Sequence, residues 1–256
     1  MRVLLLGGST EASALARMLA PDKRFEATLS LAGRTAMPRA QPIAVRSGGF
    51  GGIEGLVRYL RDERIDVLAD ATHPFAAQMS RNAIEAASIT GTPLLAVERP
   101  GWERQPGDDW LEVPDIVSAV AALGPKPRRV FSVGSLVLNE LEAAPQHTYV
   151  VRLIDKPAIF DGFRNIVLIS ARGPFSAEED IRLFERHRID VVLAKNSGGH
   201  ATASKIQAAR ALKLPVIMVK RPFVPPRPTV PAAEYAMLWL ARHYDASALR
   251  GVKTQG

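Results

Sequence analysis

The sequence predicts an α/β protein of two domains, each built on a parallel sheet that helices cover on both faces. Short β-rich apolar runs alternate with longer stretches of helical spacing, which is the pattern of βαβ units. Residues 124–127 read Gly-Pro-Lys-Pro, a composition typical of a linker, and the alternation begins again after them. We therefore expect one domain at 1–125, a second at 128–222, and a Pro-rich segment with a C-terminal helix and tail at 223–256.

The alternation gives the expected elements in order. The apolar runs predict first-domain strands at 2–6, 25–31, 43–45, 65–69 and 94–97, and the segments rich in Ala, Leu, Arg and Glu predict helices at 10–19, 53–63, 75–88 and 115–123. The same reasoning predicts second-domain strands at 129–133, 148–154, 166–170, 191–194 and 216–219, with helices at 136–143, 178–187 and 202–212. Five prolines make residues 222–231 extended, and the helix expected at 232–243 packs back on either domain.

Composition and charge exclude several classes of protein. The chain has 256 residues, of which 47% are hydrophobic, enough to bury a core for one large domain or two modest ones. It has no cysteine, which excludes disulfides, thiolate zinc sites and cysteine nucleophiles, and its five histidines show no ligand spacing, so we expect no metal. No apolar run has the length of a signal peptide or membrane helix, so we expect a cytoplasmic protein with no membrane partner. A net charge of +7 fits a polyanionic partner, but only 6% of residues are aromatic, which argues against nucleic acid.

The strongest local signal lies where the first strand ends in glycines and opens into a helix. Backbone at Gly7 and Gly8 can approach a phosphate closely, and the helix N-terminus at Ser9, Thr10 and Glu11 favours an anion. The match to the dinucleotide pattern G-x-G-x-x-G/A is imperfect, because Ser9 stands where the second glycine belongs. The alternative is a tight turn that Ser9 or Thr10 merely caps.

The end of the second strand predicts which nicotinamide cofactor is used. An acid there takes the ribose 2′-hydroxyl of NAD, whereas an arginine accommodates the 2′-phosphate of NADP. Here Gly33 and Arg34 follow the strand and no acid is present, which favours NADP. The alternative is that Arg34 is an ordinary surface residue.

A third group of polar residues follows the fourth strand. Asp70, Thr72 and His73 lie at the carboxyl edge, where open α/β sheets bind ligands. We expect a role close to the cofactor, and His73 is a candidate proton donor. The alternative is plain helix initiation at Pro74.

Basic residues follow four strands of the second domain. Because parallel strands end at one edge, these cations are expected to converge with nearby glycines into a site for several carboxylates or phosphates. The alternative for each residue is simple exposure to solvent. The residues are Arg152, Arg172 with Gly173, Lys195 with Ser197 and Gly198, and Arg221 after Lys220.

Five motifs in this order resemble the precorrin-6A reductase family of cobalamin biosynthesis. They are residues 7–12 (GGSTEA), 70–75 (DATHPF), 172–175 (RGPF), 195–198 (KNSG) and 219–222 (VKRP). The resemblance implies two Rossmann-like domains, an interdomain cleft that holds the active site, and NADPH-dependent reduction of one ring double bond of precorrin-6A to give precorrin-6B. Ser9, and Ser132 with Val133, depart from the family pattern, and we expect these departures to alter a hydroxyl contact to the ligand at most, without changing the reaction class.

A tetrapyrrole with many carboxylates suits a cationic strand edge. We expect the NADPH pyrophosphate at residues 7–11, its 2′-phosphate at Arg34 and its nicotinamide near residues 70–73. Substrate carboxylates then meet the second-domain cations, and the proton comes from Asp70, His73, Lys195, water or the substrate itself. We favour a metal-free substrate, and we also expect transient contacts with neighbouring enzymes of the pathway.

Three other functions remain open at this point. A cofactor-free tetrapyrrole enzyme of the uroporphyrinogen-III synthase type also has two α/β domains, but the glycine turn and Arg34 argue against it. A nucleotide-sensing regulator would use the first domain and leave the second-domain cations without a ligand. Nucleic-acid binding through the +7 charge would weaken steeply with salt.

Overall fold

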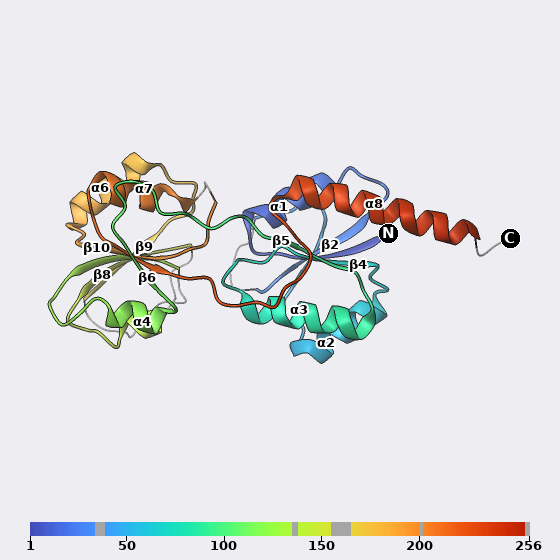
Figure 1. Cartoon of the computed structure of the whole chain (residues 1–256), viewed down its shortest axis with the longest axis horizontal. Coiled ribbons are helices and arrows are strands. Elements are labelled where there is room, and N and C mark those ends of the chain that lie inside the picture. Colours follow the sequence, from blue (N-terminus) through green and yellow to red (C-terminus); the bar gives the residue numbers. More distant parts are fainter. Residues whose placement is uncertain (34–38, 135–137, 155–164, 200–201, 254–256) are drawn as a thin grey trace. The chain divides into compact units, whose positions relative to one another are not determined.

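The computed structural model describes residues 1–33, 39–134, 138–154, 165–199 and 202–253 (Figure 1). The chain divides into two compact units. The first unit consists of Met1–Arg99 together with Phe223–Gly256, and the second unit is Pro100–Pro222. Each unit contains a six-stranded sheet in which all described strand pairs are parallel. The predicted α/β fold class is confirmed.

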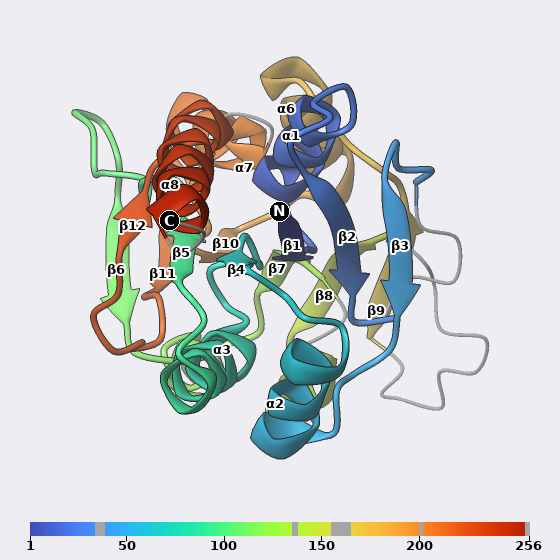
Figure 2. The ribbon, with the colours of Figure 1, turned by 90° about the vertical axis from the view of Figure 1, so that its right-hand side faces the viewer.

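The first unit is a parallel sheet between two pairs of helices. Its elements are β1 (Arg2–Leu6), α1 (Thr10–Leu19), β2 (Glu26–Leu31), β3 (Ala44–Ser47), α2 (Gly52–Asp62), β4 (Val67–Asp70), α3 (Ala77–Thr90), β5 (Leu94–Val97), β12 (Thr229–Val230) and α8 (Ala233–Lys253). The strand order is β12-β5-β4-β1-β2-β3. Val3 and Leu5 pack with α1 and α8, whereas Leu4 and Leu6 pack with α2 and α3. Alternate side chains of β1 thus contribute to the cores on the two faces of the sheet. Figure 2 shows the helix pairs on these opposite faces.

The second unit repeats this architecture with its own core. Its elements are β6 (Trp110–Val113), α4 (Ile116–Ala121), β7 (Arg129–Val133), α5 (Leu138–Leu141), β8 (Thr148–Leu153), β9 (Ile166–Ser170), α6 (Ala177–His187), β10 (Val191–Lys195), α7 (Ser204–Ala211) and β11 (Val216–Val219). The strand order is β6-β11-β10-β7-β8-β9. Phe131 on β7 packs with Phe184 on α6 at a ring distance of 4.8 Å. Figure 1 shows α6 and α7 on one face of this sheet and α4 on the other.

The predicted domain limits need correcting at the point where the chain leaves the first unit, and the C-terminal segment belongs to that first unit. Residues 110–113 form β6, which pairs with β11 of the second sheet, so the first unit ends at Arg99 and not at 125. In the Pro-rich segment, Thr229 and Val230 pair with Ala96 and Val97 of β5 in the first sheet. The C-terminal helix α8 packs on α1. The predicted linker at 124–127 therefore lies inside the second unit.

Most predicted elements are present with limits shifted by a few residues. The helix expected at 75–88 begins at Ala77, and Ala76 occupies its cap position without a side-chain bond. The strand expected at 43–45 runs to Ser47. Of the helix expected at 136–143, α5 covers Leu138–Leu141, while 136 and 137 lie outside the described residues.

None of the helices that the structure describes combines the length and hydropathy of a membrane span. Within the same residues, no three His, Asp or Glu side chains are grouped so as to hold a metal ion.

Candidate cofactor and substrate sites

The glycine turn that was predicted to bind phosphate lies between β1 and α1. Gly7 donates its N–H to the Ser30 carbonyl at 2.9 Å, which keeps the turn against the end of β2. Gly8 has a φ of 113°, in the region that favours glycine, and a Cβ there would have no atom within 4 Å. The backbone therefore turns in open space directly before α1. An anion can approach the first N–H groups of the helix at this point.

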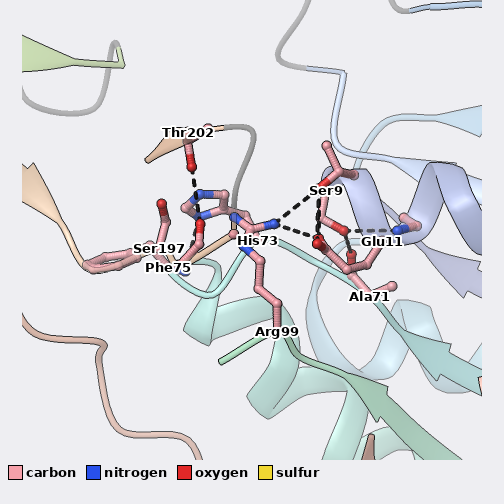
Figure 3. A network of polar contacts seen from close by, with 12 residues as sticks. Ser9, Glu11, Ala71, His73, Phe75, Arg99, Ser197 and Thr202 are labelled. Atoms are coloured by element: carbon pink, nitrogen blue, oxygen red, sulfur yellow. Dashed lines mark hydrogen bonds and ion pairs between the residues drawn. The ribbon is translucent and has the colours of Figure 1, made fainter. Parts of the chain in front are cut away.

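Ser9 caps α1 and links it to the end of β4 (Figure 3). Its Oγ accepts from Ala12 N at 3.0 Å and donates to the Ala71 carbonyl at 2.6 Å. The single hydroxyl proton is thus used within the protein. The Ser9 side chain therefore acts as a helix cap, as the alternative interpretation expected. The backbone N–H of Ser9 can still donate to a phosphate.

Glu11 places a carboxylate in the first turn of α1, and Arg99 neutralises it. Arg99 Nη1 lies 2.5 Å from Glu11 Oε2, and the two side chains are 10% and 18% exposed. The Thr10 hydroxyl also donates to this carboxylate at 3.0 Å. Burial raises the pKa of Glu11, but its backbone hydrogen bond and Arg99 outweigh this and lower it. The helix N-terminus therefore keeps its affinity for a further anion despite the acidic residue.

Asp70 is a buried centre of internal contacts at the end of β4. Its Oδ1 accepts from the Thr72 hydroxyl at 2.8 Å and the Thr72 N–H at 3.2 Å. Arg227, from the segment that returns to the first unit, lies 3.6 Å from Asp70 Oδ2 and 3.2 Å from Glu98. Asp70 is 2% exposed, and these contacts are all with the protein's own groups at this edge.

His73 has its ring orientation defined by the backbone. Its Nδ1 accepts from the Phe75 N–H at 3.2 Å, and the two rings are 6.0 Å apart. A proton on the neutral imidazole therefore resides on Nε2. This tautomer makes Nε2 the proton-carrying atom at this edge.

Arg46 lies one residue beyond the predicted end of the third strand. It lies on β3 beside the end of β2, and its Nη1 donates to Ser30 Oγ at 2.7 Å. Gly33 follows β2 with a φ of 72°, and a Cβ there would lie 3.2 Å from Ser47 Oγ. The predicted Arg34 lies outside the described residues.

In the second unit, the loop after β10 begins beside Lys195 and is held by several contacts. Arg221 Nε donates to the Asn196 carbonyl at 2.9 Å and its Nη2 donates to Ser197 O at 3.2 Å. Gly198 has a φ of 67°, and a Cβ there would lie 2.0 Å from the Pro100 carbonyl oxygen. Only glycine fits, so Arg221 and Gly198 set the path of the Lys195 loop.

Trp102 holds the same loop from the other side. Asn196 Oδ1 accepts from Trp102 N at 2.7 Å, and Trp102 Nε1 donates to the Gly199 carbonyl at 3.1 Å. The ammonium of Lys205 lies 4.4 Å from the Trp102 ring centroid. Trp102 therefore packs against this loop.

Arg152 differs from the other strand-end cations because it has a buried internal partner. Its guanidinium donates to Asp180 at 2.6 and 3.2 Å, and the side chains are 6% and 0% exposed. The rings of Phe175 and Phe131 lie 3.7 and 5.2 Å from the guanidinium carbon. The Arg152 guanidinium is therefore paired with Asp180 and packs against Phe175 of the segment 172–175. Arg172, in contrast, is exposed after β9.

Taken together, the two parallel-sheet units and the glycine turn after β1 define a two-domain Rossmann-like protein. The profile of the family "Precorrin-6x reductase CbiJ/CobK" matches residues 2–241, and the chain belongs to this family.

Individual relatives agree over nearly the whole chain. It is 50% identical to the precorrin-6A reductase of Rhodobacter capsulatus over 243 residues, covering 94% of this chain and 96% of the relative. It is 48% identical to that of Sinorhizobium sp over 248 residues, covering 96% and 95%. The solved structure of the CobK precorrin-6A reductase superposes with a TM-score of 0.90 at 49% identity, covering 95% of this chain and 97% of that one. The predicted resemblance is confirmed.

Proposed function

We propose that this protein is an NADPH-dependent precorrin-6A reductase that reduces one ring double bond of its substrate to give precorrin-6B. The observation that carries the proposal is the near full-length identity of 50% to a precorrin-6A reductase. Identity to the cobalt-precorrin-6A reductase of Salmonella typhimurium is 27% over 231 residues, covering 86% of this chain and 87% of that relative. This difference supports a metal-free substrate.

The first unit supplies groups that suit a dinucleotide. The turn at Gly7 and Gly8, with the first N–H groups of α1, would hold the pyrophosphate, and Arg34 would meet the 2′-phosphate. Thr72 and His73 lie at the neighbouring strand end, where the nicotinamide is expected. When bound, the reduced nicotinamide supplies the hydride.

The second unit supplies cations for an acidic macrocycle. Arg172 lies in an exposed turn, and Lys195 begins a loop that Arg221 and Gly198 hold in place. We propose that Arg172 and Lys195 bind substrate carboxylates and that Arg221 positions the loop. Of the three side chains predicted as possible proton donors, Asp70 is engaged internally, which favours His73 through Nε2 over Asp70.

A cofactor titration tests the first half of the proposal. We expect the protein to bind NADPH more tightly than NADH, and Arg34→Ala to weaken NADPH binding about 10- to 100-fold, since a charge-assisted contact to phosphate is lost. Isothermal calorimetry measures both, with and without substrate. Exposed Arg17→Ala, on α1, is the matched control, which should leave both affinities unchanged. Binding of neither dinucleotide in the presence of substrate would contradict the proposal and favour a cofactor-free tetrapyrrole enzyme.

A further inference from the structure

We propose that Arg227 is a positioning residue for hydride transfer, which acts through the buried carboxylate of Asp70 to fix Thr72 and His73 at the end of β4. The inference rests on the proposed function, which expects the nicotinamide beside Thr72 and His73. It assigns a role to a residue of the C-terminal segment, which the sequence separates widely from β4. Arg227 then determines kcat and not the affinity for the cofactor.

The side chain of Arg227 lies between two carboxylates of the first unit. Its Nη2 donates to Glu98 Oε2 at 3.2 Å and lies 3.6 Å from Asp70 Oδ2. The side chains of Arg227 and Asp70 are 10% and 1% exposed, whereas that of Glu98 is 29% exposed. Glu98 can therefore exchange its contact with the guanidinium for water, and Asp70 cannot.

Arg227 supplies the charge that balances Asp70. Among the described residues, Asp70 Oδ2 accepts no hydrogen bond and forms an ion pair with Arg227 alone. A buried carboxylate without a compensating cation is strongly disfavoured. Loss of the Arg227 guanidinium must therefore move Asp70 towards water.

Asp70 fixes the residues that follow it in the chain. Its Oδ1 accepts from the Thr72 hydroxyl at 2.8 Å and from the Thr72 N–H at 3.2 Å. His73 comes directly afterwards, and its Nδ1 accepts from the Phe75 N–H at 3.2 Å. A movement of Asp70 thus displaces Thr72 and turns the imidazole of His73.

The glycine turn after β1 is held by other contacts. Ser9 Oγ donates to the Ala71 carbonyl at 2.6 Å (Figure 3), and the Gly7 N–H donates to the Ser30 carbonyl at 2.9 Å. Neither contact includes Arg227. We therefore expect loss of Arg227 to disturb the nicotinamide end of the site and to leave the pyrophosphate end in place.

The segment that carries Arg227 is attached to the sheet by its backbone. The Ala96 N–H donates to the Pro228 carbonyl at 2.8 Å, and the Glu98 N–H donates to the Val230 carbonyl at 2.9 Å. These bonds remain when the Arg227 side chain is replaced. A variant at this position therefore tests the contact with Asp70 and not the attachment of β12.

Steady-state kinetics of Arg227→Met with precorrin-6A, together with calorimetric titration of NADPH, test the inference. We expect kcat to fall about 10- to 100-fold, because displacement of a positioned group by about 1 Å can have that effect. The dissociation constant and KM for NADPH should stay within about twofold of wild type. Arg227→Lys keeps the charge without the planar fork and should fall in between. Exposed Arg242→Ala, on α8 of the same segment, is the control and should behave as wild type.

A compensating variant identifies Asp70 as the residue through which Arg227 acts. Asp70→Asn keeps an oxygen that accepts from Thr72, but it removes the charge that Arg227 balances. The double variant Arg227→Met, Asp70→Asn should therefore be faster than Arg227→Met alone. A double variant no faster than the single one would contradict action through Asp70.

The ligand-free protein gives a second readout that does not depend on turnover. Nitrogen-15 NMR at a pH where the imidazole is neutral reports which ring nitrogen of His73 carries the proton, with His73→Gln for assignment. Wild type and Arg242→Ala should carry it on Nε2. Arg227→Met should show a mixture of the two tautomers, because Nδ1 is no longer held against the Phe75 N–H.

The remaining outcomes decide against the inference or between it and the proposed function. Equal losses of kcat and NADPH affinity in Arg227→Met would show that the residue only maintains the fold. If this variant does not fold, as judged by circular dichroism, Arg227→Lys replaces it and must lower kcat with NADPH affinity unchanged. An active wild type with an equally active Arg227→Met and an unchanged His73 tautomer refutes the positioning role alone, whereas wild type that does not reduce precorrin-6A refutes the proposed function as well.

Discussion

Gly198→Ala is expected to reduce reductase activity at least about 100-fold, because misplacement of a loop by about 1 Å can have that effect. A Cβ at this position would lie 2.0 Å from the Pro100 carbonyl oxygen and 2.8 Å from Arg221 Nη2, and the φ of 67° is itself unfavourable for alanine. The backbone oxygen cannot move cheaply, so the loop that begins at Lys195 must shift.

Steady-state kinetics and NADPH titration of the same variant separate this effect from a general loss of structure. NADPH affinity should stay at the wild-type value, since the proposed cofactor groups belong to the first unit. Gly124→Ala is the matched control: Gly124 has a φ of 74° in the same unit, but a Cβ there would have no atom within 4 Å. Wild-type activity in Gly198→Ala would show that the loop does not position the substrate.

Asp180→Ala is expected to lower the free energy of unfolding of the second unit by about 3–5 kcal/mol, the usual loss when one partner of a buried ion pair is removed. Arg152 would then be left as a buried cation between two aromatic rings, with no carboxylate beside it. Urea denaturation measures the effect.

The double variant Arg152→Met, Asp180→Ala identifies the cause. It removes both charges, so it should lose less stability than Asp180→Ala alone. Glu112→Ala breaks the exposed pair with Lys220, whose side chains are 51% and 58% exposed, and should change stability by less than about 1 kcal/mol. Equal losses in the single and double variants would mean that shape and packing, not the uncompensated charge, dominate at this position.

Local sequence patterns predicted the parallel sheets because each buried strand and each amphipathic helix has its own characteristic spacing of hydrophobic residues. Such patterns could not predict that β6 belongs to the second sheet and β12 to the first. These strands have four and two residues, and what assigns them to a sheet is pairing with β11 and β5, which are distant in the sequence. The apparent linker at 124–127 is only the connection between α4 and β7.

The candidate site shows a similar division. The glycine turn was predictable because its function depends on consecutive residues. Arg152 and Arg172 look alike in the sequence, and only the helix that carries Asp180 distinguishes them. The third strand was predicted to end at 45, so its last two residues, Arg46 and Ser47, were not placed at the strand edge.

The measurement that tests the central claim most directly is anaerobic incubation of the purified protein with metal-free precorrin-6A and NADPH, followed by mass spectrometry. We expect one NADPH to be oxidised per macrocycle reduced, and a product that carries two more hydrogens than the substrate. The Rhodobacter capsulatus reductase, 50% identical to this chain, is the positive control. Failure to convert precorrin-6A under conditions in which that enzyme does so would contradict the account.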